Sequence, residues 1–125
     1  MFKGKILVVD DEVYILHILE FSLGAEGFEV ITANSGELAI EKAKEQNPDL
    51  IVLDIMMPVL DGYETCRRIK RDSVTKHIPV VLLTAKGREV DKRLGFEVGA
   101  VDYVVKPFSP SRLIERITEI IGCKK

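Results

Sequence analysis

The chain has 125 residues, 46% of them hydrophobic, and a formal net charge of −2, which is sufficient for one domain with a buried core. Acidic and basic residues are mixed without a polybasic block, so we expect no direct nucleic acid or membrane partner. Its apolar runs are too short to span a bilayer, and residues 1–4 contain no apolar core of a signal peptide. Cys66 and Cys123 are not part of a Cys-x-x-Cys pattern, so we expect two free thiols. These features together favour a cytoplasmic protein.

Strand-like and helix-like patterns alternate along the whole chain. The predicted strands cover residues 5–10, 28–33, 49–54, 78–84 and 101–105. The predicted helices cover residues 12–25, 36–46, 62–72, 88–98 and 110–121. Strict alternation of this kind is typical of an α/β domain, in which helices cover both faces of a parallel sheet. The second strand is more polar than the others and ends on Ala33 and Asn34, so we expect it at an edge, away from any reactive centre.

The other four strands each lead into polar residues suited to phosphate chemistry. The first strand ends on Asp10 and Asp11, and the third ends on Asp54. The fourth ends on Thr84 and the fifth leads into Lys106. Ligands of open parallel sheets bind beyond the carboxyl ends of the strands. The sequence therefore predicts three carboxylates, a hydroxyl and an ammonium group at one edge of the sheet.

The adjacent carboxylates of Asp10 and Asp11 repel each other unless a cation joins them. Mg²⁺ prefers oxygen ligands in octahedral geometry and binds in proteins through one or two carboxylates together with phosphate oxygens. Asp54 and the backbone carbonyl of Met56 could complete such a site. The simpler alternative is that the pair only favours the start of the next helix, where carboxylates are stabilising.

Asp54 is the candidate nucleophile, because a carboxylate can accept a phosphoryl group as an acyl phosphate. The charge repulsion between Asp54 and an anionic donor would have to be offset by the metal ion and by Lys106. Thr84 could donate its hydroxyl to a phosphoryl oxygen. Simpler roles stay open: Asp54 as a third metal ligand without a covalent role or as a turn aspartate before Pro58, and Lys106 as a structural counter-ion of the carboxylates.

Four segments together resemble the receiver domain of two-component response regulators. They are Val8-Val9-Asp10-Asp11-Glu12, Asp54-Ile55-Met56-Met57-Pro58-x-x-Asp61-Gly62, Leu83-Thr84-Ala85 and Asp102-Tyr103-x-x-Lys106-Pro107-Phe108. The resemblance covers essentially the whole chain in the expected order. It implies a single receiver domain over residues 1–125 with a flavodoxin-like, doubly wound sheet of five parallel strands in the order 2-1-3-4-5 and five helices.

The resemblance also implies a role for each strand-end residue. Asp54 becomes the acceptor of a phosphoryl group from a histidine kinase or a histidine phosphotransfer protein, and Thr84 and Lys106 contact that group. Mg²⁺, with Mn²⁺ as an alternative, is held by Asp10, Asp11, Asp54 and the Met56 carbonyl. Tyr103 matches the aromatic switch residue that turns inward when Thr84 moves toward the phosphate. Such a protein is a phosphoacceptor that catalyses only its own phosphorylation and dephosphorylation, and is not an enzyme in the usual sense.

Three further expectations concern lifetime and partners. Positions that tune phosphoryl lifetime in the family hold Met56 and Lys86 here, and neither side chain would position an attacking water, so we expect slow hydrolysis. The face formed by the fourth helix, fifth strand and fifth helix is expected to bind a downstream protein or a second copy of the chain. The donor is expected to dock on a set of apolar residues for which extra core packing is an equally good explanation: Tyr14, Ile15, Ile18, Pro107 and Phe108.

Rival functions fit the sequence less well. A haloacid-dehalogenase-like phosphatase would carry a second aspartate where Met56 lies. A flavodoxin-type carrier of FMN would need a hydroxyl- or glycine-rich loop after the first strand, where Asp10, Asp11 and Glu12 would repel a bare phosphate. A binding module that works without phosphate would be expected to have lost Asp54 or Lys106. His17 and His77 have no motif partners and are expected to face solvent.

Overall fold

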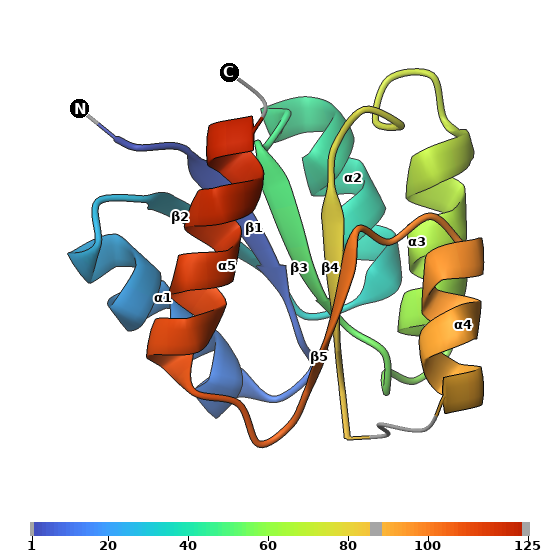
Figure 1. Ribbon diagram of the computed structural model, residues 1–125. Coiled ribbons are helices and arrows are strands. Elements are labelled where there is room, and N and C mark those ends of the chain that lie inside the picture. The colour runs from blue at the N-terminus through green and yellow to red at the C-terminus, as the bar shows by residue number, and fades with distance from the viewer. Residues whose placement is uncertain (1, 86–88, 124–125) are drawn as a thin grey trace.

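The computed structural model describes residues 2–85 and 89–123, and the side chains of residues 89–91 and 123 are outside the description. Strands and helices alternate strictly along it (Figure 1). Every element lies within two residues of its predicted bounds. The elements in chain order are β1 (Lys5–Val9), α1 (Val13–Ala25), β2 (Glu29–Ala33), α2 (Gly36–Gln46), β3 (Leu50–Asp54), α3 (Gly62–Arg71), β4 (Val80–Thr84), α4 (Glu89–Glu97), β5 (Asp102–Val105) and α5 (Pro110–Cys123).

All five strands pair in parallel in the order β2-β1-β3-β4-β5, which confirms the predicted topology and places β2 at an edge. The register matters for the strand ends. Val9 of β1 pairs with Leu53 of β3, so Asp10 and Asp54 follow at the same level on neighbouring strands. Thr84 pairs with Val105, the residue before Lys106. The sheet itself thus aligns the four predicted strand ends along one edge.

Helices cover the two faces of the sheet unequally: α1 and α5 lie on one face, and α2, α3 and α4 on the other (Figure 1). Strands β1, β3 and β4 are buried on both faces, which explains their continuous apolar runs. Successive side chains alternate between two cores. Ile6 and Val8 pack toward α1 and α5, whereas Leu7 and Val9 pack toward the other helices. Within the described residues, no helix has the length and apolar character needed to cross a bilayer.

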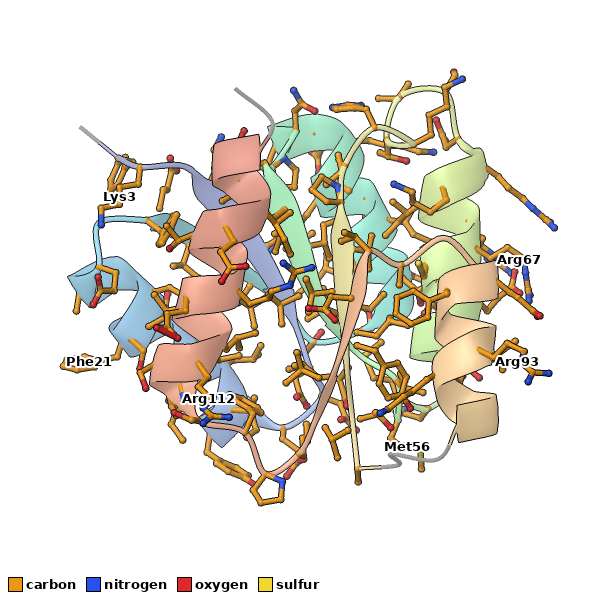
Figure 2. All side chains as sticks on the ribbon, viewed as in Figure 1. Lys3, Phe21, Met56, Arg67, Arg93 and Arg112 are labelled. Carbon is orange, nitrogen blue, oxygen red and sulfur yellow. The ribbon has the colours of Figure 1, made fainter. Side chains whose placement is uncertain are left out.

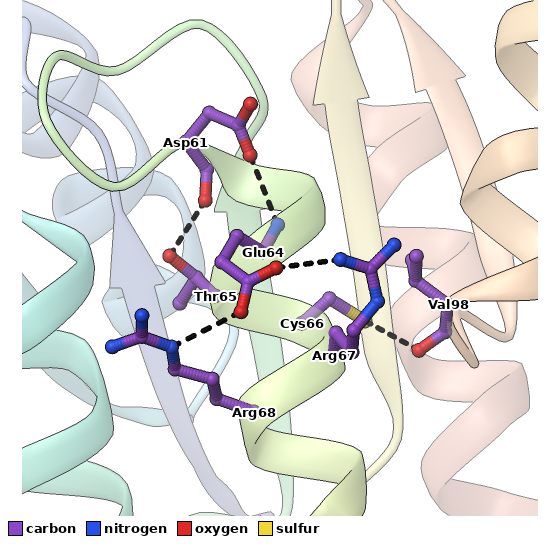
Figure 3. Close-up of polar contacts among 7 residues, drawn as sticks. All are labelled: Asp61, Glu64, Thr65, Cys66, Arg67, Arg68 and Val98. Atoms are coloured by element: carbon purple, nitrogen blue, oxygen red, sulfur yellow. Dashed lines mark hydrogen bonds and ion pairs between the residues drawn. The ribbon is translucent and has the colours of Figure 1, made fainter.

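The loop after β3 is held tightly against the strand end by Gly62 at the start of α3. The Gly62 amide donates to the Ile55 carbonyl over 2.9 Å. A Cβ atom at Gly62 would lie 2.5 Å from the Asp54 carbonyl oxygen, so no other residue fits without displacing the backbone there. Asp61 caps the helix by accepting the Glu64 amide at 2.9 Å (Figure 3). These contacts fix the backbone that carries Asp54.

Candidate functional site

The three predicted acidic residues meet at the carboxyl end of the sheet. Asp10 and Asp54 are buried, with 0% and 2% of their surface exposed, whereas Asp11 is exposed. One carboxylate oxygen from each of the three lies within 4.8 Å of the others. Opposite ligands of an octahedral Mg²⁺ are about 4.1 Å apart, so a small adjustment would suffice for binding. The three carboxylates therefore fit a divalent cation in number, chemistry and spacing.

Lys106 also reaches this cluster, as predicted. The backbone amide of Lys106 donates to the Thr84 carbonyl, extending the β4–β5 pairing by one residue. Its ammonium nitrogen lies 3.2 Å from Asp54 Oδ1 and 3.2 Å from Asp10 Oδ2. A third carboxylate, that of Glu12, lies 3.8 Å away. Only 18% of the Lys106 side chain is exposed, so these contacts form in partly desolvated surroundings.

The two buried carboxylates have pKa values above the ordinary value of an aspartate. Burial raises the pKa of Asp54 to about 6, and repulsion from Asp10 adds to the effect. Burial also raises the pKa of Asp10, although the Glu12 amide and Lys106 partly offset it. For Lys106, burial acts to lower the pKa, but attraction by Asp54 and Asp10 outweighs it and the pKa is raised. One ammonium group thus stabilises two buried carboxylates incompletely.

One oxygen of Asp54 without a hydrogen bond also indicates that the buried carboxylates are incompletely stabilised. Oδ1 of Asp54 is buried and, in the described part of the chain, forms no hydrogen bond of acceptable geometry, although the Lys106 ammonium is its ion-pair neighbour. Buried polar atoms normally have hydrogen-bond partners, and exceptions gather at functional positions. A carboxylate in this condition can take a metal ion, a proton or an electrophile such as phosphorus.

The remaining predicted switch and lifetime residues are placed as follows. Thr84 is buried at the end of β4. Tyr103 on β5 already points inward, with 8% of its surface exposed, and a Cβ atom on Gly95 of α4 would lie 3.0 Å from its ring. Met56 extends to solvent beside the strand ends, with 56% of its surface exposed (Figure 2). Lys86 lies outside the described residues.

The predicted docking residues line one open groove beside Lys106. Tyr14 and Ile18 are 60% and 44% exposed, so they are surface residues, and the packing of α1 is carried instead by Leu16, Leu19 and Leu23. The peptide bond between Lys106 and Pro107 is cis. The groove has a volume of about 450 Å³ and is lined by Tyr14, Ile15, Ile18, Ala85, Lys106, Pro107, Phe108 and Pro110.

The predicted output face combines apolar and charged residues. Arg116 on α5 forms ion pairs with Asp102 of β5 and with Glu119. The exposed apolar residues of this region are Leu94 and Phe96 on α4, Val101 just before β5, and Val105 at the end of β5.

Sequence reasoning named Glu12 in the motif after the first strand but missed its proximity to Lys106, from which 94 positions separate it. The signal that could have found it is its place as the N-cap residue of α1, a position where glutamate is an unusual choice. The two histidines are exposed as predicted, and His77 Nε2 lies 3.1 Å from Asn47 Oδ1.

Comparison with known proteins is consistent with this geometry. The sequence model of the response regulator receiver domain matches residues 6–118. The alkaline phosphatase synthesis transcriptional regulatory protein PhoP of Bacillus subtilis is 49% identical over 117 residues, which make up 94% of this chain and 48% of PhoP. The chain therefore spans about half the length of this curated relative.

Solved structures resemble the fold over nearly its full length. The chemotaxis protein CheY4 of Vibrio cholerae has a TM-score of 0.89 and 34% identity, covering 94% of this chain and 98% of CheY4. The receiver domain of a sensor histidine kinase from Pseudomonas aeruginosa has a TM-score of 0.87 and 31% identity, covering 95% of this chain and 98% of that domain. The latter structure is described as having a magnesium ion coordinated in its active-site cleft.

Proposed function

This chain belongs to the response regulator receiver domain family, and on that premise we propose that residues 1–125 form one receiver domain switched by phosphorylation of Asp54. Receiver domains act in two-component signalling and are not classical enzymes. The observation that carries the proposal is the buried Asp54 carboxylate, which has one oxygen without a hydrogen bond and lies 3.2 Å from Lys106. The donor is a histidine kinase or a histidine phosphotransfer protein.

The transfer itself is a displacement at phosphorus. An oxygen of the Asp54 carboxylate forms a bond to phosphorus as the bond from phosphorus to the donor's imidazole nitrogen breaks. The electron pair leaves with the imidazole, whose other nitrogen carries a proton so that the ring departs neutral. Lys106 offsets the negative charge on the phosphoryl oxygens, and Thr84 can donate its hydroxyl to one of them. Both residues lie at the same sheet edge as Asp54.

Asp10, Asp11, Asp54 and the backbone carbonyl of Met56 would hold Mg²⁺, with Mn²⁺ as an alternative. The spacing of the three carboxylates within 4.8 Å and the raised pKa of Asp54 support this assignment. When bound, the ion supplies positive charge that lets a carboxylate and an anionic donor approach each other. Glu12, which is exposed, is left outside this set because it does not belong to the group of carboxylate oxygens that lie within 4.8 Å of one another.

The output is a change in the population of two conformations, to which the phosphoryl group adds about −1.5 to −2 of charge. Thr84 and Tyr103 transmit that change to the face of α4, β5 and α5. This face binds a downstream protein or a second copy of the chain. PhoP is named as a transcriptional regulator, but the chain covers only 48% of it and has a net charge of −2, so we assign it no direct contact with nucleic acid.

The cytoplasm is the proposed location, because the buried Cys66 is a free thiol and the donors of this family act there. Hydrolysis of the Asp54 phosphate is proposed to be slow, because the exposed Met56 side chain offers no group to orient water. Met56→Asn should shorten the lifetime of the phosphoprotein, measured by intact mass over time. An unchanged decay rate would contradict that assignment, and Lys86→Glu is the parallel test at the second position.

The donor is proposed to dock in the groove of Tyr14, Ile15, Ile18, Pro107 and Phe108. Ile18→Ala should slow transfer from a kinase without slowing transfer from acetyl phosphate, because only the kinase covers this surface. Equal slowing with both donors would assign Ile18 to the integrity of the fold instead.

The direct test of the proposed function is the mass of the intact protein after incubation with acetyl phosphate and Mg²⁺. We expect one added phosphoryl group on the wild type and none on Asp54→Asn or after EDTA treatment. A folded wild-type protein that takes up no phosphoryl group from acetyl phosphate or from any histidine kinase would contradict the proposal and favour a phosphate-independent binding module.

A further inference from the structure

Glu12 occupies the N-cap position of α1 but does not cap the helix. Its backbone is extended, with φ −91° and ψ 111°, and its side chain accepts no hydrogen bond from the first turn. Serine, threonine, aspartate and asparagine are the residues that normally stabilise this position. Glu12 thus gives no capping benefit to α1, and its contacts elsewhere must explain where the side chain lies.

Those contacts join the phosphorylation site to the groove beside it. The backbone amide of Glu12 donates to Asp10 Oδ1 at 3.0 Å, which ties the residue to the acidic cluster. Its carboxylate lies 3.8 Å from the ammonium of Lys106, and among the described residues no other cation forms an ion pair with it. On the other side, the neighbouring Glu12 carboxylate raises the pKa of the Tyr14 hydroxyl. The carboxylate therefore sits between Lys106 and a residue of the groove.

Lys106 is shared by three carboxylates that differ in exposure. Asp10 and Asp54 approach it from the buried side, whereas 47% of the Glu12 side chain is exposed. Glu12 is thus the anion that meets Lys106 from the side of solvent. An anionic donor that enters from solvent is repelled by the Glu12 carboxylate. Its phosphoryl oxygens must also replace that carboxylate as the ion-pair partner of Lys106.

We propose that Glu12 competes with the phosphoryl group for Lys106 and thereby slows phosphorylation of Asp54 by small anionic donors. This inference rests on the proposed function of Asp54. With acetyl phosphate, the bond from phosphorus to the acetate oxygen breaks, acetate leaves with the electron pair, and Asp54 forms the new bond. Glu12 touches none of these atoms and acts through Lys106, so it is a positioning residue that sets how readily the site accepts a free anion.

The test compares initial rates of phosphoryl incorporation from acetyl phosphate in wild type and Glu12→Gln at saturating Mg²⁺. The variant should react between about three- and tenfold faster, a modest factor because the carboxylate is half exposed and screened. The advantage should shrink as ionic strength rises. Glu20→Gln is the matched control, because Glu20 is exposed on the same helix and forms no ion pair among the described residues, and it should leave the rate unchanged.

A second measurement separates this role from damage to the fold. Removing Glu12 also removes negative charge near the metal site, so titration calorimetry should show about twofold weaker binding of Mg²⁺ to Glu12→Gln. A disordered site would lose both metal affinity and rate, whereas the proposal requires them to move in opposite directions. Glu12→Asp keeps the charge but is one methylene too short to reach Lys106 as well, and it should show part of the increase in rate.

The outcomes for the two proposals differ. If the wild type acquires a phosphoryl group on Asp54 and Glu12→Gln reacts no faster, the role of Glu12 is refuted while the proposed function stands. If neither protein is phosphorylated at Asp54 by any donor, the proposed function fails and the role of Glu12 with it.

Discussion

The two ends of the sheet treat polar groups in opposite ways. At the amino ends of the strands, polar side chains satisfy the backbone: Asp49 accepts the Lys5 amide at 2.8 Å, and Lys70 donates to the Ile78 carbonyl at 2.8 Å. At the carboxyl ends, Asp10 and Asp54 are buried against each other, with raised pKa values and a single ammonium group between them.

The difference shows which end is built for stability and which for chemistry. Hydrogen bonds from side chains to the backbone stabilise the fold without external help. Buried carboxylates that share one cation destabilise it until another cation or a reaction removes their charge. The fold tolerates this destabilisation because burial of the apolar strands β1, β3 and β4 stabilises the sheet and offsets it.

The largest effect is expected from Gly62→Ala, which would disturb the backbone of Asp54. The added methyl group would lie 2.5 Å from the Asp54 carbonyl oxygen, so we expect a loss of about 3 kcal/mol in the free energy of unfolding. Urea denaturation measures it. Gly24→Ala on α1 is the control: the space around Gly24 is open, and alanine should stabilise the helix by about 0.5–1 kcal/mol. Equal effects of the two variants would contradict this account of Gly62.

Asp54→Asn should stabilise the metal-free protein at pH 7 by about 2 kcal/mol. The folded protein holds the Asp54 proton more tightly, with a pKa of about 6 against the ordinary 3.8. The stability that the protonated Asp54 carboxyl contributes to the folded state is therefore complete below about pH 4 and is lost as the pH rises through 6. The gain from the substitution should appear over the same range, in urea denaturation with EDTA at a series of pH values.

Asp49→Asn is the matched variant at the other end of the sheet. It weakens a charge-assisted bond to the Lys5 amide and should cost about 1 kcal/mol. If Asp49→Asn and Asp54→Asn changed stability in the same direction, the contrast between the two ends would be refuted.

Mg²⁺ should relieve the repulsion at the carboxyl end. At a metal concentration ten times the dissociation constant, binding to the folded state alone should add about 1.4 kcal/mol of stability. Thermal denaturation with and without EDTA measures the gain. Asp10→Asn should lose most of it, since one of the three clustered carboxylates is removed, whereas Asp49→Asn should keep it. An equal gain in all three proteins would point to a metal site elsewhere.

The smallest effect concerns the backbone of the loop after β3. Val59 has φ +69° and is 95% exposed, although a β-branched residue is disfavoured in this conformation. Val59→Gly should therefore stabilise the protein by about 0.5 kcal/mol, after the greater freedom of glycine in the unfolded chain is subtracted. Val74→Gly, at an exposed turn residue without positive φ, should destabilise it by a similar amount. Urea denaturation of the pair measures the difference.

Local pattern was sufficient to predict the elements and their order. Continuous apolar runs and their polar strand ends reflect burial on both faces of a parallel sheet, which a sequence displays directly. The boundary errors have local causes. The predicted strand 78–84 begins at Val80 because Ile78 closes a turn by donating its amide to the Thr75 carbonyl. The last helix continues two residues beyond the predicted end at Ile121, to Cys123.

What the sequence alone determined is the set of reactive groups at the carboxyl edge, because the alternating pattern predicts parallel strands whose carboxyl ends share one edge, while the strand order was implied by the resemblance to receiver domains. Only the tertiary structure decided how their charges are distributed: Asp10 is buried while its neighbour Asp11 is exposed, and Lys106 serves Asp54, Asp10 and Glu12 together. The physical reason is that ionisation depends on desolvation and on distances of a few ångströms between strands. Neither quantity is encoded in the spacing of residues along the chain.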